Sequence, residues 1–93
     1  MPKVTIYSTL LCPYCFAARR LLKNKGIEFE EIRVDKDPQK RLEMIQRSGR
    51  FTVPQIFIDD FHVGGYDDMA ELNRKGKLDA LFGAVMASDG QSR

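Results

Sequence analysis

The stretch that decides the fold runs from residue 4 to residue 22 and reads VTIYSTLLCPYCFAARRLL. Its first five residues are mostly β-formers in alternation and predict a strand. From Pro13 onward the apolar side chains recur at helical spacing and predict a helix, with proline at the first position, where its missing N–H is tolerated. Cys12 and Cys15 therefore lie where a strand passes into a helix.

Strand and helix patterns alternate along the rest of the chain. The first helix should end at Gly26, and residues 27–34 predict a second strand whose register the spacing leaves uncertain. Asp37 followed by Pro38 is typical of a helix start. The apolar side of that second helix, which should end near residues 48–49, is predicted to hold Leu42, Met44 and Ile45.

A hairpin and two further helices are predicted after residue 54. Residues 55–58 and 61–63 are short strand patterns joined by Asp59 and Asp60, and Gly64 and Gly65 follow them. A third helix begins at the acidic residues 67–68, and after residue 76 a last one carries apolar residues at helical spacing, namely Leu78, Leu81, Phe82 and Val85.

The predicted order is βαβαββαα, which is an α/β fold. The first two strands should be parallel because a helix joins them, and the last two should be antiparallel because a two-residue turn joins them. We expect a four-stranded mixed sheet with helices on both faces. Residues 1–87 should form one domain, followed by a polar, frayed tail at 88–93.

The composition excludes several classes of function. The 93 residues are 43% hydrophobic, and the charges nearly cancel to +2, so nucleic-acid binding through phosphate neutralisation is not expected. No signal peptide or membrane-spanning stretch is predicted. The expected compartment is the cytoplasm, where thiols are kept reduced and a disulfide between close cysteines is seldom a structural staple.

The spacing of the two cysteines permits redox chemistry. Residues three apart on a helix face the same way, so the sulfurs of Cys12 and Cys15 can approach disulfide distance. Cys12 precedes the first turn, where unpaired N–H groups and the helix dipole favour a thiolate. Cys15 lies within that turn, less exposed. We therefore predict that Cys12 attacks a substrate sulfur and Cys15 resolves the mixed disulfide.

Two other interpretations of the pair were weighed. A zinc site would need two more ligands, but His62 is the only histidine and the chain has no further cysteine, so no metal is expected. Two inert core thiols are also conceivable. The proline between them and the strand-to-helix context favour the redox interpretation.

The chain resembles the glutaredoxin family, specifically its bacterial dithiol members, in three motifs that occur in the family's order and at its spacing. They are Cys12-Pro13-Tyr14-Cys15, Thr52-Val53-Pro54-Gln55 before a strand, and Gly64-Gly65-Tyr66-Asp67-Asp68 after a hairpin, and together they span about the first eighty residues. The resemblance implies a thioredoxin-like fold. It also implies a glutathione-dependent thiol–disulfide oxidoreductase, with glutathione as reductant and with disulfide-bearing or glutathionylated proteins as partners.

The resemblance also implies which residues bind glutathione. Pro54 should follow a cis peptide bond, and the Val53 backbone should then pair with the ligand as a short added strand. Gly64 and Gly65, followed by Tyr66 and Asp67 at a helix start, should let backbone N–H groups reach the γ-glutamyl carboxylate, and Asp67 should hold the ammonium group. Arg41, helped by Lys40, would meet the glycine carboxylate. The complete predicted binding set is Tyr14, Arg41, Thr52, Val53, Pro54, Gly65, Tyr66 and Asp67.

One position departs from the family pattern. Family members commonly carry a lysine three residues ahead of the first cysteine, and here that residue is Thr9, followed by Leu10 and Leu11. Without the lysine, the helix terminus is the main stabiliser of the thiolate, unless Arg19 or Arg20 reaches back. The two leucines predict a more apolar rim and a preference for apolar protein segments.

Two competing functions remain open at this point. One keeps the fold and takes electrons from thioredoxin reductase, for delivery to an enzyme such as ribonucleotide reductase. The other is a dimeric iron–sulfur carrier that bridges a cluster through Cys12 and bound glutathione. Pro13 and Cys15 count against the carrier, because cluster-binding relatives usually have glycine and serine there, so a monomer is expected.

Overall fold

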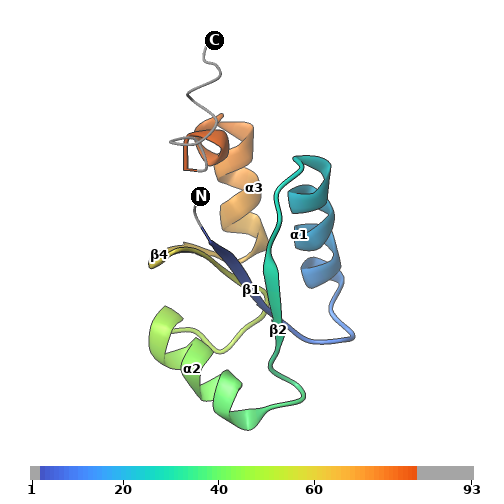
Figure 1. Ribbon diagram of the computed structural model, residues 1–93, viewed down its shortest axis with the longest axis vertical. Coiled ribbons are helices and arrows are strands. Elements are labelled where there is room, and N and C mark those ends of the chain that lie inside the picture. The colour runs from blue at the N-terminus through green and yellow to red at the C-terminus, as the bar shows by residue number, and fades with distance from the viewer. Residues whose placement is uncertain (1–2, 82–93) are drawn as a thin grey trace.

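The computed structural model describes residues 3–81, and they form a four-stranded mixed sheet with helices on both faces (Figure 1). The elements along the chain are β1 (Val4–Ser8), α1 (Pro13–Asn24), β2 (Glu30–Arg33), α2 (Pro38–Ser48), β3 (Gln55–Ile58), β4 (Phe61–Gly64) and α3 (Tyr66–Arg74). Residues 77–81 begin a further helical turn. The predicted Phe82, Val85 and the tail at 88–93 lie outside the described residues.

The sheet has the strand order β2-β1-β3-β4. β1 is parallel to β2 and antiparallel to β3, and β3 and β4 form an antiparallel hairpin through Asp59 and Asp60, as predicted. The C-terminal end of β1, the N-terminal end of β3 and the C-terminal end of β4 therefore lie at the same end of the sheet, with Tyr7 opposite Gln55 and Ile56 opposite Gly64. All three sequence motifs lie at that end of the sheet.

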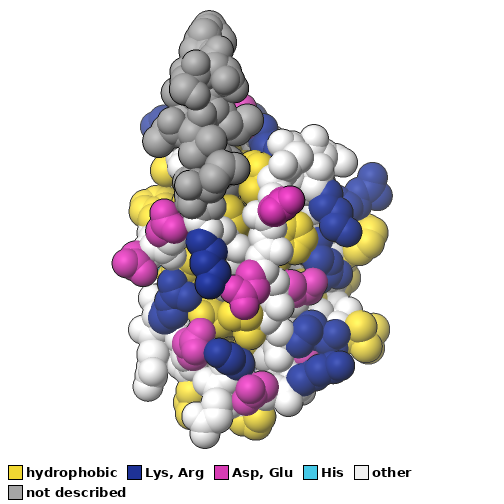
Figure 2. All heavy atoms as spheres, viewed as in Figure 1, with side chains coloured by type: hydrophobic (Ala, Val, Ile, Leu, Met, Phe, Trp, Pro, Cys, Tyr) yellow, Lys and Arg dark blue, Asp and Glu magenta, His cyan; other side chains and the backbone are white. Residues whose placement is uncertain are grey.

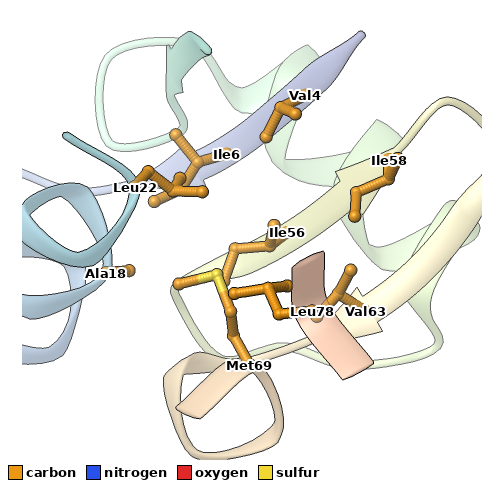
Figure 3. Packing of buried hydrophobic residues seen from close by; sticks show 9 residues of the cluster. All are labelled: Val4, Ile6, Ala18, Leu22, Ile56, Ile58, Val63, Met69 and Leu78. Carbon is orange, nitrogen blue, oxygen red and sulfur yellow. The ribbon is translucent and has the colours of Figure 1, made fainter. Parts of the chain in front are cut away.

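Alternation along the strands divides the core into two layers. On one face, side chains of β1, β3 and β4 pack against α1, α3 and Leu78 (Figure 3), and these residues are Val4, Ile6, Ala18, Leu22, Ile56, Ile58, Val63, Met69 and Leu78. On the other face Tyr7, Val34 and Phe57 pack with Met44 of α2. The period of two in β1 and β3 sends successive residues to opposite layers.

The helix ends follow the predicted chemistry. Pro13 and Pro38 each lie in the first turn of their helix, and the Asp37 carboxylate accepts a hydrogen bond from the Gln39 N–H at 3.0 Å. Gly49 ends α2 in the left-handed conformation, with φ of 73°.

Two expectations were wrong in detail. The second strand was predicted over residues 27–34, but β2 covers only Glu30–Arg33, the four residues that pair with Thr5–Ser8 of β1. Ile27 and Phe29 instead pack against the α1 and α3 side of the core. Leu42 was predicted on the apolar side of α2, but it is exposed, and Met44 and Ile45 alone pack inward.

Candidate functional site

The loop between β1 and α1 delivers Cys12 to the helix terminus. Cys12 is the N-cap of α1, and its Sγ accepts a hydrogen bond from the Cys15 backbone N–H at 3.1 Å. An N–H that points at this sulfur stabilises a thiolate there, and the free N–H groups of the first turn act in the same direction. Cys12 is partly exposed, so a substrate sulfur can reach it.

Cys15 has the opposite environment. Its side chain is 0% exposed, and burial, together with its hydrogen bond to Cys12, raises the pKa of the Cys15 thiol to about 12. At neutral pH it therefore remains a protonated thiol behind Cys12. This difference in exposure suits Cys12 as the attacking sulfur and Cys15 as the resolving sulfur.

The loop before β3 lies against the cysteines. The Val53–Pro54 peptide bond is cis, as the resemblance implied, and the Val53 carbonyl oxygen lies 3.9 Å from Cys12 Sγ. Within residues 3–81 no partner occupies the Val53 N–H. A peptide laid along this loop would therefore find a free backbone donor close to the sulfur.

Beside these residues is an open cavity of about 170 Å³. Seven of the predicted binding residues line it, namely Tyr14, Thr52, Val53, Pro54, Gly65, Tyr66 and Asp67. The rings of Tyr14 and Tyr66 stack with centroids 6.3 Å apart and form one wall. Arg41 is exposed on α2 and does not line this cavity, so its role stays a prediction.

Two lining residues, Arg50 and Asp68, were not predicted. The Asp68 carboxylate accepts hydrogen bonds from the Gly65 N–H and from the Arg50 guanidinium, both at 2.9 Å. These two bonds hold the pKa of Asp68 below its usual range. The Gly65 N–H is therefore already occupied by Asp68 within the chain. The guanidinium of Arg50 also lies on the cavity wall, where it is paired with the Asp68 carboxylate.

A part-buried hydrogen-bond network supports the Thr52 end of the loop. The side-chain amide of Gln55 donates to the Thr52 carbonyl oxygen at 3.0 Å, and its oxygen lies 2.7 Å from His62 Nε2. Since the Gln55 nitrogen faces a carbonyl, its oxygen must accept, and His62 Nε2 carries the proton. His62 thus reaches Thr52 from the edge strand β4.

The basic side chains near the cysteines are already paired. Arg19 binds Glu31 at 2.7 Å, and the same carboxylate oxygen accepts a hydrogen bond from the Ser8 hydroxyl at 2.5 Å. Arg20 lies over the Phe16 ring. Both guanidinium groups are thus engaged with partners other than Cys12. Within residues 3–81 no cluster of three or more metal-ligating side chains occurs, and no helix there could cross a membrane.

Comparison with known proteins gives the class of this site. The glutaredoxin family model matches residues 4–63, more than half of the chain. The chain is 52% identical to a glutaredoxin of Pseudomonas aeruginosa over 90% of its own length and all of the relative's. It is 53% identical to glutaredoxin 3 of Escherichia coli strain K12, covering 88% of this chain and 99% of the relative.

Solved structures agree with the sequence relatives. The solution structure of a Brucella melitensis glutaredoxin superposes with a TM-score of 0.78 at 53% identity, over 87% of this chain and 88% of that one. A buckwheat glutaredoxin–glutathione complex gives 0.79 at 29% identity, over 86% and 76%. The chain belongs to the glutaredoxin family. It has the thioredoxin-like fold, and its relatives support a role as a thiol–disulfide oxidoreductase.

Proposed function

We propose that this protein is a glutathione-dependent oxidoreductase that reduces glutathione mixed disulfides and protein disulfides. The observation that carries the proposal is the position of Cys12. Its sulfur is bound by the Cys15 N–H, approaches the Val53 carbonyl and stands beside a cavity with backbone donors and Arg50. The glutathione complex of the buckwheat relative supports the same ligand.

Within the proposal, glutathione lies along residues 52–54 and extends into the cavity. Its cysteine residue pairs with the Val53 backbone as an added strand. The γ-glutamyl carboxylate binds at the N-terminus of α3, close to Arg50, and the ammonium group meets Asp67. Tyr14 covers the ligand from the side of α1.

The monothiol route has two steps. The Cys12 thiolate attacks the glutathione sulfur of a glutathionylated protein, forming a Cys12–glutathione disulfide and releasing the protein thiolate, which takes a proton from water. A second glutathione thiolate then attacks the bound glutathione sulfur. Glutathione disulfide leaves and the Cys12 thiolate is restored.

The dithiol route uses Cys15. Cys12 attacks one sulfur of a protein disulfide and releases the first protein thiol. Cys15 then loses its proton and attacks Cys12 Sγ, forming the Cys12–Cys15 disulfide and releasing the second protein thiol. Two glutathione molecules reduce that disulfide in turn.

Glutaredoxin reduction potentials of roughly −200 to −230 mV lie close to that of the glutathione pool. The direction of the reaction therefore depends on the reduction potential of glutathione in the compartment. We place the protein in the cytoplasm, as a monomer without a resident metal.

The source of electrons is tested by supplying each reductant system alone. With a small glutathione mixed disulfide as substrate, glutathione plus glutathione reductase should sustain NADPH consumption. Thioredoxin reductase without glutathione should not. Turnover with thioredoxin reductase alone would contradict the proposal and favour a thioredoxin-like donor.

A further inference from the structure

Two leucines stand in solvent immediately before the reactive cysteine. Leu10 is 64% exposed and Leu11 is 91% exposed, both in the loop between β1 and α1. Figure 2 shows hydrophobic side chains at the surface near this loop, next to charged ones. Large apolar side chains exposed next to a reactive group are typical of an interaction surface.

The loop that carries these leucines is held in place. The Leu10 N–H donates to Asp35 Oδ2 at 3.2 Å, and Arg33 binds the same carboxylate through two bonds of 2.8 and 2.6 Å. The guanidinium of Arg33 keeps the pKa of Asp35 well below its usual range, so the carboxylate stays ionised throughout physiological pH. The Leu10 backbone is thus tied to the segment that follows β2.

The leucines and the cavity lie on opposite sides of Cys12. Asp35, which anchors Leu10, follows β2, and β2 is the edge strand on one side of β1. The cavity is built at the start of β3 and the end of β4, on the other side of β1. A substrate bonded to Cys12 and reaching toward β2 therefore meets the leucines first.

The charges near the leucines favour an apolar occupant. Arg33 is bound to Asp35, and Arg19 to Glu31, so these groups are already compensated within the chain. A charged partner segment would gain little from them, whereas an apolar segment would bury both leucines.

Resting on the function proposed above, we propose that Leu10 and Leu11 form a docking surface for protein substrates. The partner it fits is a segment with apolar side chains next to its disulfide-bonded or glutathionylated cysteine. A substrate sulfur must come to about 2 Å from Cys12 Sγ, which brings the residues beside it within reach of Leu10 and Leu11. Glutathione then fills the cavity side, and the protein chain that carries the cysteine covers the β2 side.

The test compares three substrates with wild type and a Leu10→Ser/Leu11→Ser double variant. Two are glutathionylated peptides of equal length, one with leucines and one with serines beside the cysteine. The third is the mixed disulfide of glutathione and 2-mercaptoethanol. Phe61→Ser is the matched control, because Phe61 is also exposed, at 52%, but pairs with Ile58 at the far end of the sheet.

For the double variant, kcat/KM on the leucine-flanked peptide should fall about fivefold or more. Its activity on the serine-flanked peptide and on the small disulfide should stay within about twofold of wild type. Phe61→Ser should resemble wild type on all three. The preference of wild type for the leucine-flanked peptide should also persist in high salt, since no charge pair carries it.

Equal loss on all three substrates, or no preference in the wild type, would overturn the docking surface while leaving the proposed function standing. Failure of wild type to turn over even the small disulfide would contradict the proposed function, and the docking surface with it. Thermal melts of the variants separate either result from unfolding, because all three substituted side chains are exposed.

Discussion

The backbone N–H of Cys15 points at the sulfur of Cys12 and donates to it across 3.1 Å. The backbone of the buried Cys15 thereby binds the partly exposed Cys12 sulfur, while the Cys15 thiol stays protonated because burial raises its pKa to about 12. The first turn of α1 thus places the two sulfurs in different environments, one partly exposed and one buried.

Alkylation should separate the two cysteines. At pH 8 iodoacetamide should modify Cys15→Ser, which keeps Cys12, at least about tenfold faster than Cys12→Ser, which keeps Cys15. Burial is the largest cause of the raised pKa of Cys15, and it persists when Cys12 is replaced. In denaturant the two rates should converge. Equal rates in the folded variants would contradict the assigned environments.

Asp68→Asn should weaken the turn at the start of α3. The variant keeps the shape but loses the charge that accepts hydrogen bonds from Gly65 and Arg50, so we expect a loss of about 1 kcal/mol and a severalfold higher KM for glutathione. Asp60→Asn, in the exposed hairpin turn, is the matched control and should change neither quantity.

The stability difference between wild type and Asp68→Asn should depend on pH. The pKa of Asp68 is lowered in the folded state, chiefly by the Gly65 N–H, so its contribution is present above the unfolded pKa of about 4. It is lost as pH falls through the lower folded pKa. Urea unfolding at pH 7 and pH 3 measures this, and a difference that grows on acidification would contradict the ion pair.

Gly64→Ala should be more damaging than Gly49→Ala. At Gly64 φ is +116°, and an added Cβ would lie 2.3 Å from Asp68 Oδ2 and 2.8 Å from Asp68 Cβ. At Gly49 φ is +73°, but nothing lies within 4 Å. We expect losses of about 3 and about 1 kcal/mol respectively in chemical unfolding. Similar losses at both positions would show that Asp68 is free to move aside.

His62 should act as a positioning residue for Thr52. Burial lowers the pKa of His62, so its ring is neutral at pH 7 and its Nε2–H holds Gln55, which in turn holds the Thr52 carbonyl. His62→Phe should raise the KM for glutathione severalfold with little change in kcat, and His62→Gln should recover part of the loss. A fall in kcat alone, or no rescue by glutamine, would argue against this role.

The sequence predicted best those features that depend on neighbouring residues. Pro13 and Pro38 mark their helix starts, and the parallel and hairpin connections follow from the lengths of the linking segments. The extent of β2 could not be predicted, because it depends on pairing with β1, a contact between segments that are far apart in the sequence. Ile27 and Phe29 follow a strand-like pattern in the sequence, but they lie outside the sheet and their side chains pack against the core.

In the site, the three motifs predicted which loops would lie together, but not the side-chain hydrogen bonds that hold those loops in place. Asp68 stands three residues after Gly65, a spacing typical of a helix N-terminus, and this signal was available. Arg50 gave no such signal, because 18 residues separate it from Asp68 and only the β3–β4 hairpin brings them together. His62 and Gln55 likewise meet only across that hairpin.

The most direct test of the account compares wild type, Cys12→Ser and Cys15→Ser in the glutathione-coupled reduction of a small mixed disulfide. Cys12→Ser should have no activity, because the attacking sulfur is lost. Cys15→Ser should retain substantial activity, because residue 15 still supplies its backbone N–H and a second glutathione can release the product. Equal loss of activity in the two variants would contradict the division of roles between Cys12 and Cys15.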